Sequence, residues 1–284
     1  MGALRAKMEC DLVVRGLGER TGRGYLGAVA RLARHYGRAP DTLAVAEVEA
    51  YLVHLRQVRQ LTWESLATVV TGLRFFYEVT LGRARAEFFI PSPKRSRKQP
   101  EVLSREEVAR LLAQTEHRRD RMLLLTTYAA GLRVSEVVAL QVSHIDSERM
   151  VLRIEQGKGR TDRYALLTER LLDELRAYWR VTRPTPWLFP GPGHRRPVTP
   201  RTALRAYVVA KGRAGITKRG GIHALRHAFA THLLDADVDL HTIQWLLGHR
   251  NIATTTRYLH LAPRALARRG SRCDVLAFAA PPPR

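Results

Sequence analysis

Residues 83–101 interrupt a chain that otherwise favours helices, and they divide it into two parts. The stretch "RARAEFFIPSPKRSRKQP" holds six Lys or Arg residues, one Glu and three prolines. Proline has no N–H donor and stops both helices and central strands, so we predict an extended basic linker. This linker either follows a polyanion or serves only as a soluble connector. A chain of 284 residues suits about two domains, and we expect one on each side.

The first part, residues 1–82, has the pattern of a small helical bundle. Thr21 is the expected N-cap of the second helix, and Gly37 lies just past its end. Thr62 and Gly82 bracket a stretch whose apolar residues recur at helical spacing. We therefore predict four helical stretches, within residues 2–17, 21–37, 45–57 and 62–82.

The second part, from Leu103, mixes helices with a strand pair. Ser104 and Glu107 have the spacing of a capping box, and Thr168 and Thr199 precede two further helices. Between them, "RMVLRIEQ" and "DRYALLT" are strand-like and flank the glycine-bracketed loop "GKGRT". The predicted fold is mainly α, with an N-terminal four-helix domain and a mixed α+β domain that combines helices with a small antiparallel sheet.

Charge narrows the possible partners. Lys and Arg number 48 against 26 acidic residues, a net charge of +22. Such a protein attracts polyanions, nucleic acid above all, although an arginine-prone genome would also produce this composition. The sequence has no apolar run near the ~18–20 residues of a membrane span and no secretory leader pattern. We expect no membrane association and a cytoplasmic protein.

The stretch "HALRHAFATHL", residues 223–233, packs His and Arg into an apolar helical pattern. A turn of ~100° per residue predicts a core face made of Leu225, Phe229, His232 and Leu233. His223, Arg226 and Ala230 are then expected on the opposite side. His232 is expected to be a core histidine with a hydrogen-bond partner.

The polar side of this helix has two interpretations besides an ordinary basic surface. The first is a phosphate site, because the planar arginine fork grips two phosphate oxygens and histidine adds a donor. The second is zinc, since His223 and His227 lie four residues apart. No suitably placed acid or cysteine completes a metal site, so we favour phosphate over zinc, while an ordinary basic surface stays open for this stretch alone.

Four further motifs accompany this helix in the second part of the chain. "GLRVSEV" supplies Arg133 and Glu136, and "GKGRTDR" supplies Lys158. "WLLGHRN" supplies His249, where a helix is expected to end at Gly248 and where Trp245 is expected to pack beneath the turn. "TTTRYLH" supplies Tyr258. In order and spacing these motifs resemble those of the tyrosine recombinases, the phage-integrase and Xer-type family, and the likeness covers nearly the whole chain.

The residues suit an attack on a DNA phosphodiester, which builds negative charge on the phosphoryl oxygens. Arg133 and Arg226 are natural bidentate clamps, while His223 and His249 can donate hydrogen bonds or move a proton. Glu136 either orients these cations or forms an ordinary i, i+3 ion pair.

Tyr258 is the predicted nucleophile, and the leaving sugar oxygen needs a general acid. The resemblance assigns that proton to Lys158, whose alternative role is a plain phosphate contact. It also implies a 3′-phosphotyrosyl link and a free 5′-hydroxyl. Because the energy of the phosphoester bond is kept, no ATP, metal or other cofactor is required.

The resemblance further implies double-stranded DNA as partner and a tetramer on two duplexes, formed from a monomer or weak oligomer. When bound to DNA the protein would lie on the bacterial nucleoid. The expected domains are 1–82 (core-binding), 83–101 (linker), 102–262 (catalytic) and 263–284 (tail). Two other functions stay open: a DNA-binding relative that does not cut, and a type IB topoisomerase.

Overall fold

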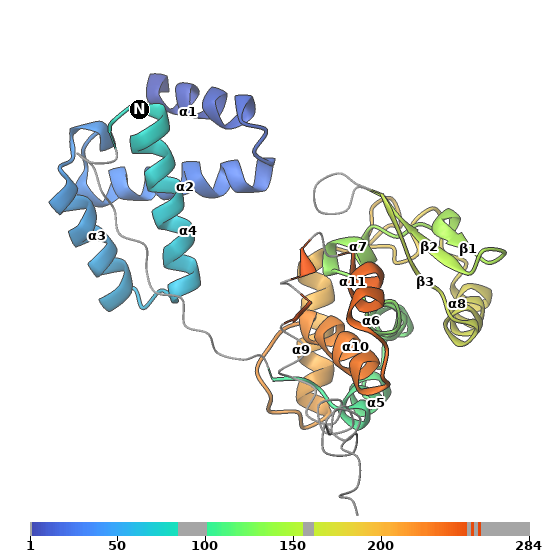
Figure 1. Ribbon diagram of the computed structural model, residues 1–284. Helices are drawn as coiled ribbons and strands as arrows, with labels where there is room; N and C mark the ends of the chain where they lie inside the picture. Colours follow the sequence, from blue (N-terminus) through green and yellow to red (C-terminus); the bar gives the residue numbers. More distant parts are fainter. Residues whose placement is uncertain (1, 85–100, 156–161, 249–250, 253–254, 257–284) are drawn as a thin grey trace, which may run out of the picture. The chain divides into compact units, whose positions relative to one another are not determined.

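The chain folds into two compact units, residues 1–98 and 99–284. The computed structural model describes residues 2–84, 101–155, 162–248, 251–252 and 255–256 (Figure 1). Most of the predicted linker, residues 85–100, lies outside the described residues. Each unit has its own apolar core.

The first unit is a bundle of four helices. These are α1 (Gly2–Val14), α2 (Glu19–Tyr36), α3 (Val45–Gln57) and α4 (Trp63–Arg74), with a 3₁₀ turn at Pro40–Thr42 and a π-helical continuation of α4 at Phe75–Thr80. The hydroxyl of Thr62 accepts the backbone N–H of Ser65 and so begins α4 as predicted. Thr21 is not the N-cap of α2, because the carbonyl of Gly18 already accepts the N–H of Gly22.

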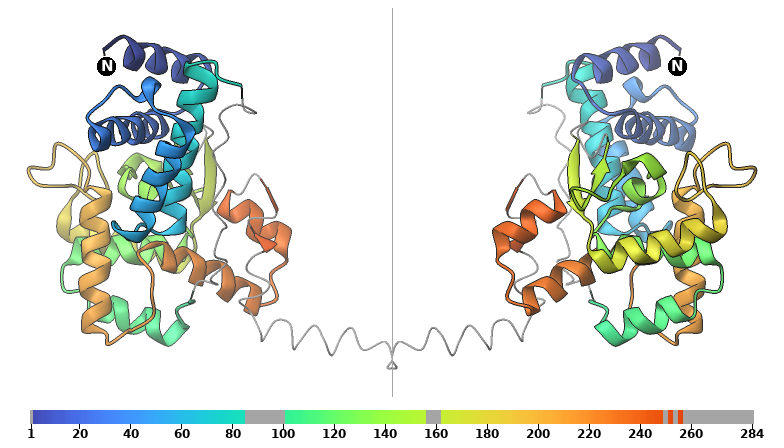
Figure 2. Two further views of the ribbon diagram at one scale, coloured as in Figure 1. Left: turned by 90° about the vertical axis from the view of Figure 1, so that its left-hand side faces the viewer. Right: turned by 90° about the vertical axis from the view of Figure 1, so that its right-hand side faces the viewer.

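Apolar side chains on all four helices form the core of this unit. Leu32, Val48 and Leu73 are fully buried in it, and so is Tyr77. The Tyr77 hydroxyl donates to the carbonyl of Pro40 at 2.6 Å, which fastens the π-helical segment to the turn before α3. Figure 2 shows α1 at one end of the unit in both views.

The second unit is mainly helical. Its helices are α5 (Arg105–Ala113), α6 (Arg118–Ala129), α7 (Val134–Val138), α8 (Glu169–Thr182), α9 (Pro200–Arg213), α10 (His223–Asp235) and α11 (Leu240–Leu247), with a 3₁₀ turn at Val142–His144. The predicted caps are confirmed: Ser104 and Glu107 form a capping box, and the hydroxyls of Thr168 and Thr199 accept N–H groups of α8 and α9.

A three-stranded antiparallel sheet lies to one side of these helices (Figure 1). Its strands are β1 (Ile145–Asp146), β2 (Val151–Ile154) and β3 (Arg163–Leu166), and Ile154 pairs with Arg163. The loop that joins β2 to β3 lies, at residues 156–161, outside the described residues. The mainly α fold with a small antiparallel sheet is thus confirmed, and the two-residue strand β1 was not predicted.

Helix α10 is buried on nearly every side, which corrects the predicted two-faced helix. Leu225 and Ala228 belong to the main core, whereas Phe229 and Ala230 belong to a second apolar cluster with α11. Ala230 was expected on the polar side and is fully buried. Arg226 is only 4% exposed, because α6, α11 and the α6–α7 turn surround the helix. His232 is confirmed as a core histidine, bonded to the Tyr128 hydroxyl at 2.8 Å.

Candidate functional site

A tight turn between α6 and α7 places Arg133. Gly131 has φ +60°, and a β-carbon built on it would lie 2.4 Å from the Phe229 ring. Only glycine therefore allows the chain to turn this close to α10. Two residues later Arg133 is the N-cap of α7, and its side chain is 20% exposed.

Glu136 stands three residues further on, in the first turn of α7. Its carboxylate accepts the backbone N–H of Arg133 at 2.8 Å through Oε2 and the Arg133 guanidinium at 2.6 Å through Oε1. The side chain is 3% exposed. Both contacts fix the carboxylate, which faces the interior and is not placed for attack on a substrate.

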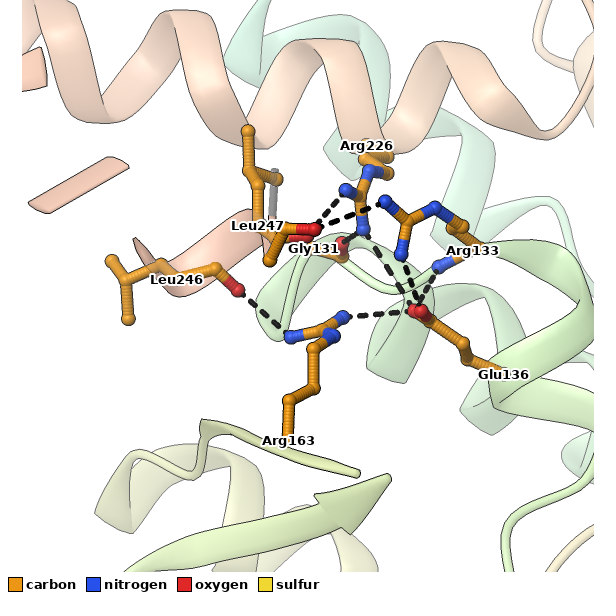
Figure 3. A network of polar contacts seen from close by, with 8 residues as sticks. Gly131, Arg133, Glu136, Arg163, Arg226, Leu246 and Leu247 are labelled. Carbon is orange, nitrogen blue, oxygen red and sulfur yellow. Dashed lines mark hydrogen bonds and ion pairs between the residues drawn. The ribbon is translucent and has the colours of Figure 1, made fainter. Parts of the chain in front are cut away.

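Two more guanidiniums surround this carboxylate (Figure 3). Arg163 of β3 donates from Nη2 to Oε2 of Glu136 at 2.8 Å. Arg226 of α10 has its Nη1 at 3.8 Å from the same oxygen and donates to the carbonyl of Gly131 at 2.6 Å. Glu136 therefore contacts three arginines from three separate segments, and the prediction that it orients the cations fits this better than a simple i, i+3 pair.

The same three arginines hold the end of α11. Arg163 donates to the carbonyl of Leu246 at 2.9 Å, Arg226 to that of Leu247 at 2.6 Å and Arg133 to that of Gly248 at 3.3 Å. Carbonyls at a helix C-terminus lack intrahelical partners and carry partial negative charge. We call Arg133, Glu136, Arg163 and Arg226 the arginine cluster. It fastens the last turn of α11 immediately before His249 in the sequence.

Electrostatics in the cluster favour charged side chains. Burial would raise the pKa of Glu136, but Arg163, followed by Arg133, holds it below its usual value. Glu136 is therefore ionised at neutral pH. Partial desolvation, and then the nearby charges of Arg226 and Arg133, lower the pKa of His223, so that its imidazole is neutral at pH 7.

The structure thus brings together three of the predicted site residues, Arg133, Glu136 and Arg226, although they come from two motifs that are about 90 residues apart in the sequence. His223 opens α10, three residues before Arg226, and its side chain is exposed. The other three predicted residues lie outside the described residues, namely Lys158, His249 and Tyr258.

Two further expectations about this region are corrected or extended. Trp245 does not pack beneath the end of α11, since it is 68% exposed and the arginine cluster takes that place. Arg163 was missed. The alternation of the strand could have indicated it. Arg163 and Ala165 lie on the same strand face, and Ala165 is buried, whereas Tyr164 between them is half exposed. A charged residue on the buried face of a strand calls for a specific partner.

In the parts of the chain that the structure describes, no three His, Cys, Asp or Glu side chains gather so that they could hold a metal ion. No helix among those residues has both the length and the apolar character needed to cross a bilayer.

Known proteins resemble the chain over almost its full length. Residues 101–264 match the model of the phage integrase family, and residues 4–87 match the N-terminal SAM-like domain of phage integrases. The putative integrase/recombinase y4qK of Sinorhizobium fredii is 43% identical over 100% of this chain and 92% of its own. Tyrosine recombinase XerD of Caulobacter vibrioides is 37% identical over 78% of each chain.

A solved structure, a lambda integrase tetramer bound to a Holliday junction, shares the fold. Its TM-score is 0.76 at 18% identity, over 90% of this chain and 76% of that one. Fold, arginine cluster and relatives together define an enzyme of the tyrosine site-specific recombinase type. The chain belongs to the phage integrase family.

Proposed function

We propose that the protein cleaves and rejoins double-stranded DNA at specific sites through a covalent 3′-phosphotyrosyl intermediate. The observation that carries the proposal is the arginine cluster, in which three guanidiniums share one carboxylate. Burying several cations around one acid costs stability. The arrangement suits a site whose other anion is a ligand, and a DNA phosphodiester is an anion of matching size and charge.

Each predicted residue has a role in the cleavage step. The Arg133 and Arg226 guanidiniums bind the phosphoryl oxygens on which negative charge develops. The phenol oxygen of Tyr258 attacks phosphorus, and the bond from phosphorus to the 5′-oxygen breaks. His223, neutral at pH 7, or His249 takes the phenol proton. Lys158 gives a proton to the leaving 5′-oxygen, because an alkoxide is a far poorer leaving group than a phenolate.

Rejoining reverses these steps with a second strand. Its 5′-hydroxyl attacks the phosphotyrosyl phosphorus and releases Tyr258. One phosphoester replaces another in each step, so neither ATP nor a metal ion enters the proposal. Residues 102–262 form the catalytic domain, and the basic residues of both units hold the duplex. Strand exchange needs two duplexes and hence four protomers, in keeping with the tetrameric form of lambda integrase on a Holliday junction.

Adduct formation on a nicked duplex tests this function. The duplex carries the sequence that the full-length protein selects from a random DNA pool, with a nick beside the cleavage point so that the released fragment diffuses away. We expect a denaturant-resistant protein–DNA adduct from the wild-type protein and none from Tyr258→Phe. Tyr164→Phe is the matched control, since Tyr164 is half exposed on β3, and it should form the adduct normally. An adduct from Tyr258→Phe would refute the assignment.

Arg226→Lys separates catalysis from binding in the same assay. Lysine keeps the charge but loses the planar fork, so we expect a loss of about 100-fold in the single-turnover rate of adduct formation. The dissociation constant for DNA should change less than about 3-fold. Equal losses in both quantities would reduce Arg226 to a binding contact. Binding without any adduct from the wild-type protein would favour a non-cutting DNA-binding protein.

A further inference from the structure

Arg163 joins three segments that are distant in sequence. It begins β3, its side chain is 14% exposed, and its guanidinium contacts Glu136 of α7 and the Leu246 carbonyl of α11. The side chain also runs across Gly248, where a β-carbon would lie 2.5 Å from Cδ of Arg163. The Arg163 side chain is therefore in van der Waals contact with the C-terminal end of α11 and also forms a hydrogen bond to it.

The sequence surroundings of Arg163 add a second observation. Lys158 stands five residues before it, on the loop between β2 and β3, and Leu246 stands three residues before His249. Arg163 therefore lies five residues after one candidate site residue, and its guanidinium bonds to the chain three residues before the other. We propose that Arg163 is a positioning residue, whose bridge from β3 to Glu136 and to the end of α11 sets the orientation of Arg133 and Arg226 toward the scissile phosphate. The inference rests on the proposed function.

The geometry around Glu136 shows how this positioning operates. Oε2 accepts from Nη2 of Arg163 and from the backbone of Arg133, both at 2.8 Å, while Nη1 of Arg226 stays at 3.8 Å, beyond hydrogen-bond distance. Arg163 occupies the place on the carboxylate that Arg226 would otherwise take. Arg226 instead holds the carbonyls of Gly131 and Leu247. Without Arg163, Glu136 draws Arg226 onto itself and turns it away from the substrate.

A purely structural role explains Arg163 poorly. Glu136 already has a charged partner at 2.6 Å in Arg133, so a further, partly buried cation adds desolvation cost to a site that has more positive than negative charge. Removing one member of a buried ion pair destabilises a protein because it leaves the other charge without a partner, but Glu136 keeps both the guanidinium and the backbone N–H of Arg133 when Arg163 is replaced. The cation at position 163 therefore serves the reaction, by holding a geometry that must be accurate to a fraction of an ångström.

Two substitutions separate positioning from folding. Arg163→Lys keeps the charge but cannot reach Glu136 and Leu246 together as the planar fork does, and Arg163→Met keeps the length without charge. For both variants we expect melting temperatures close to the wild-type value and DNA dissociation constants within about 3-fold. The single-turnover rate of adduct formation should fall by about 10- to 100-fold.

The control and a double-mutant cycle complete the experiment. Arg121→Lys is the matched control, because Arg121 of α6 pairs with Glu174 of α8 at the surface, and it should keep the wild-type rate. Glu136→Gln should itself lower the rate. In that background Arg163→Lys should cost less than about 3-fold, since a positioning residue that acts through Glu136 has little left to act on.

Each result of this experiment supports or overturns the proposal that Arg163 is a positioning residue. Wild-type rates in both Arg163 variants overturn the proposal, and so does a rate loss that only accompanies a lower melting temperature. Full additivity with Glu136→Gln also overturns it. If the wild-type protein forms no adduct, the proposed function fails instead, and the two failures are thereby distinguished.

Discussion

Arg226 lies almost fully inside the protein, where each donor of a guanidinium needs a partner. Two of its nitrogens donate to main-chain carbonyls, of Gly131 and Leu247, and Glu136 lies nearby. A buried cation held by carbonyl dipoles keeps its charge and orientation without being neutralised. This is the state in which an arginine can stabilise charge that develops on a bound phosphate, because little reorganisation is needed.

Gly248→Ala tests the close contact between Arg163 and α11. Gly248 has φ +61° and lies under the Arg163 side chain, so alanine brings both backbone strain and a displaced guanidinium. Gly215→Ala is the matched control, since Gly215 has φ +66° with no atom within 4 Å of the added carbon. Both changes should cost about 1–2 kcal/mol of unfolding free energy.

Only Gly248→Ala should also slow adduct formation, by about 10-fold or more. Chemical denaturation and single-turnover cleavage measure the two effects. Equal rates for the two glycine variants would contradict a role for the Arg163 contact in catalysis.

The pH dependence of cleavage tests the proton acceptor. Desolvation and the charges of Arg226 and Arg133 lower the pKa of His223 below its usual value near 6.5, and Glu136 opposes them. A lowered pKa means that the imidazole is neutral at pH 7 and gains its proton only in more acidic solution. The cleavage rate should therefore fall as pH decreases, with a midpoint below 6.5, and His223→Gln should remove that midpoint. A cleavage rate that rises as pH decreases through this range would show that the cationic imidazole is the active form.

At the residue scale, the spacing of the motifs was enough to predict site residues. Features that depend on packing, such as the burial of a side chain, could not be predicted from it. Arg133, Glu136 and Arg226 meet in one cluster, as the motifs suggest. The burial of Arg226 was not predictable, because helical periodicity cannot distinguish a solvent face from a polar interior. Arg163 was missed since its partners come from α7 and α11, far away in the sequence.

At the scale of elements, α10 is the centre of the second unit. One side of it packs into the main core and another packs against α11. Because both sides are in contact with other elements, small side chains such as alanine are required for close packing. The sequence predicts this helix, but helical periodicity alone does not show that its many alanines are buried on all sides. The caps at Ser104, Thr168 and Thr199 were predictable because a cap needs only local chemistry.

Ala228→Leu tests the burial of α10. Ala228 is fully buried against the main core, and the larger side chain should lower the free energy of unfolding by about 1–3 kcal/mol. Ala177→Leu on an exposed part of α8 is the matched control and should change it by less than about 0.5 kcal/mol. Chemical denaturation measures both, and similar values for the two variants would contradict the packing described for α10.

At the scale of the whole molecule, the division into a helical unit and a mixed unit was readable from prolines and periodicity. The fold class followed from a few strand-like residues between helices. The short strand β1 was not readable, because two residues show no alternation. The arrangement of the second unit matters for function because it brings α7, β3, α10 and the end of α11 to one carboxylate.

The most direct test identifies the amino acid that becomes linked to DNA. The adduct of the wild-type protein is digested with trypsin and nuclease, and the modified peptide is sequenced by mass spectrometry. The chain from Asn251 to Arg264 contains a single tyrosine, Tyr258, so the modified residue is unambiguous. The account predicts a nucleotide joined through its 3′-phosphate to Tyr258, with a 5′-hydroxyl on the released strand. A nucleotide on any other residue, or one joined through its 5′-phosphate, would contradict it.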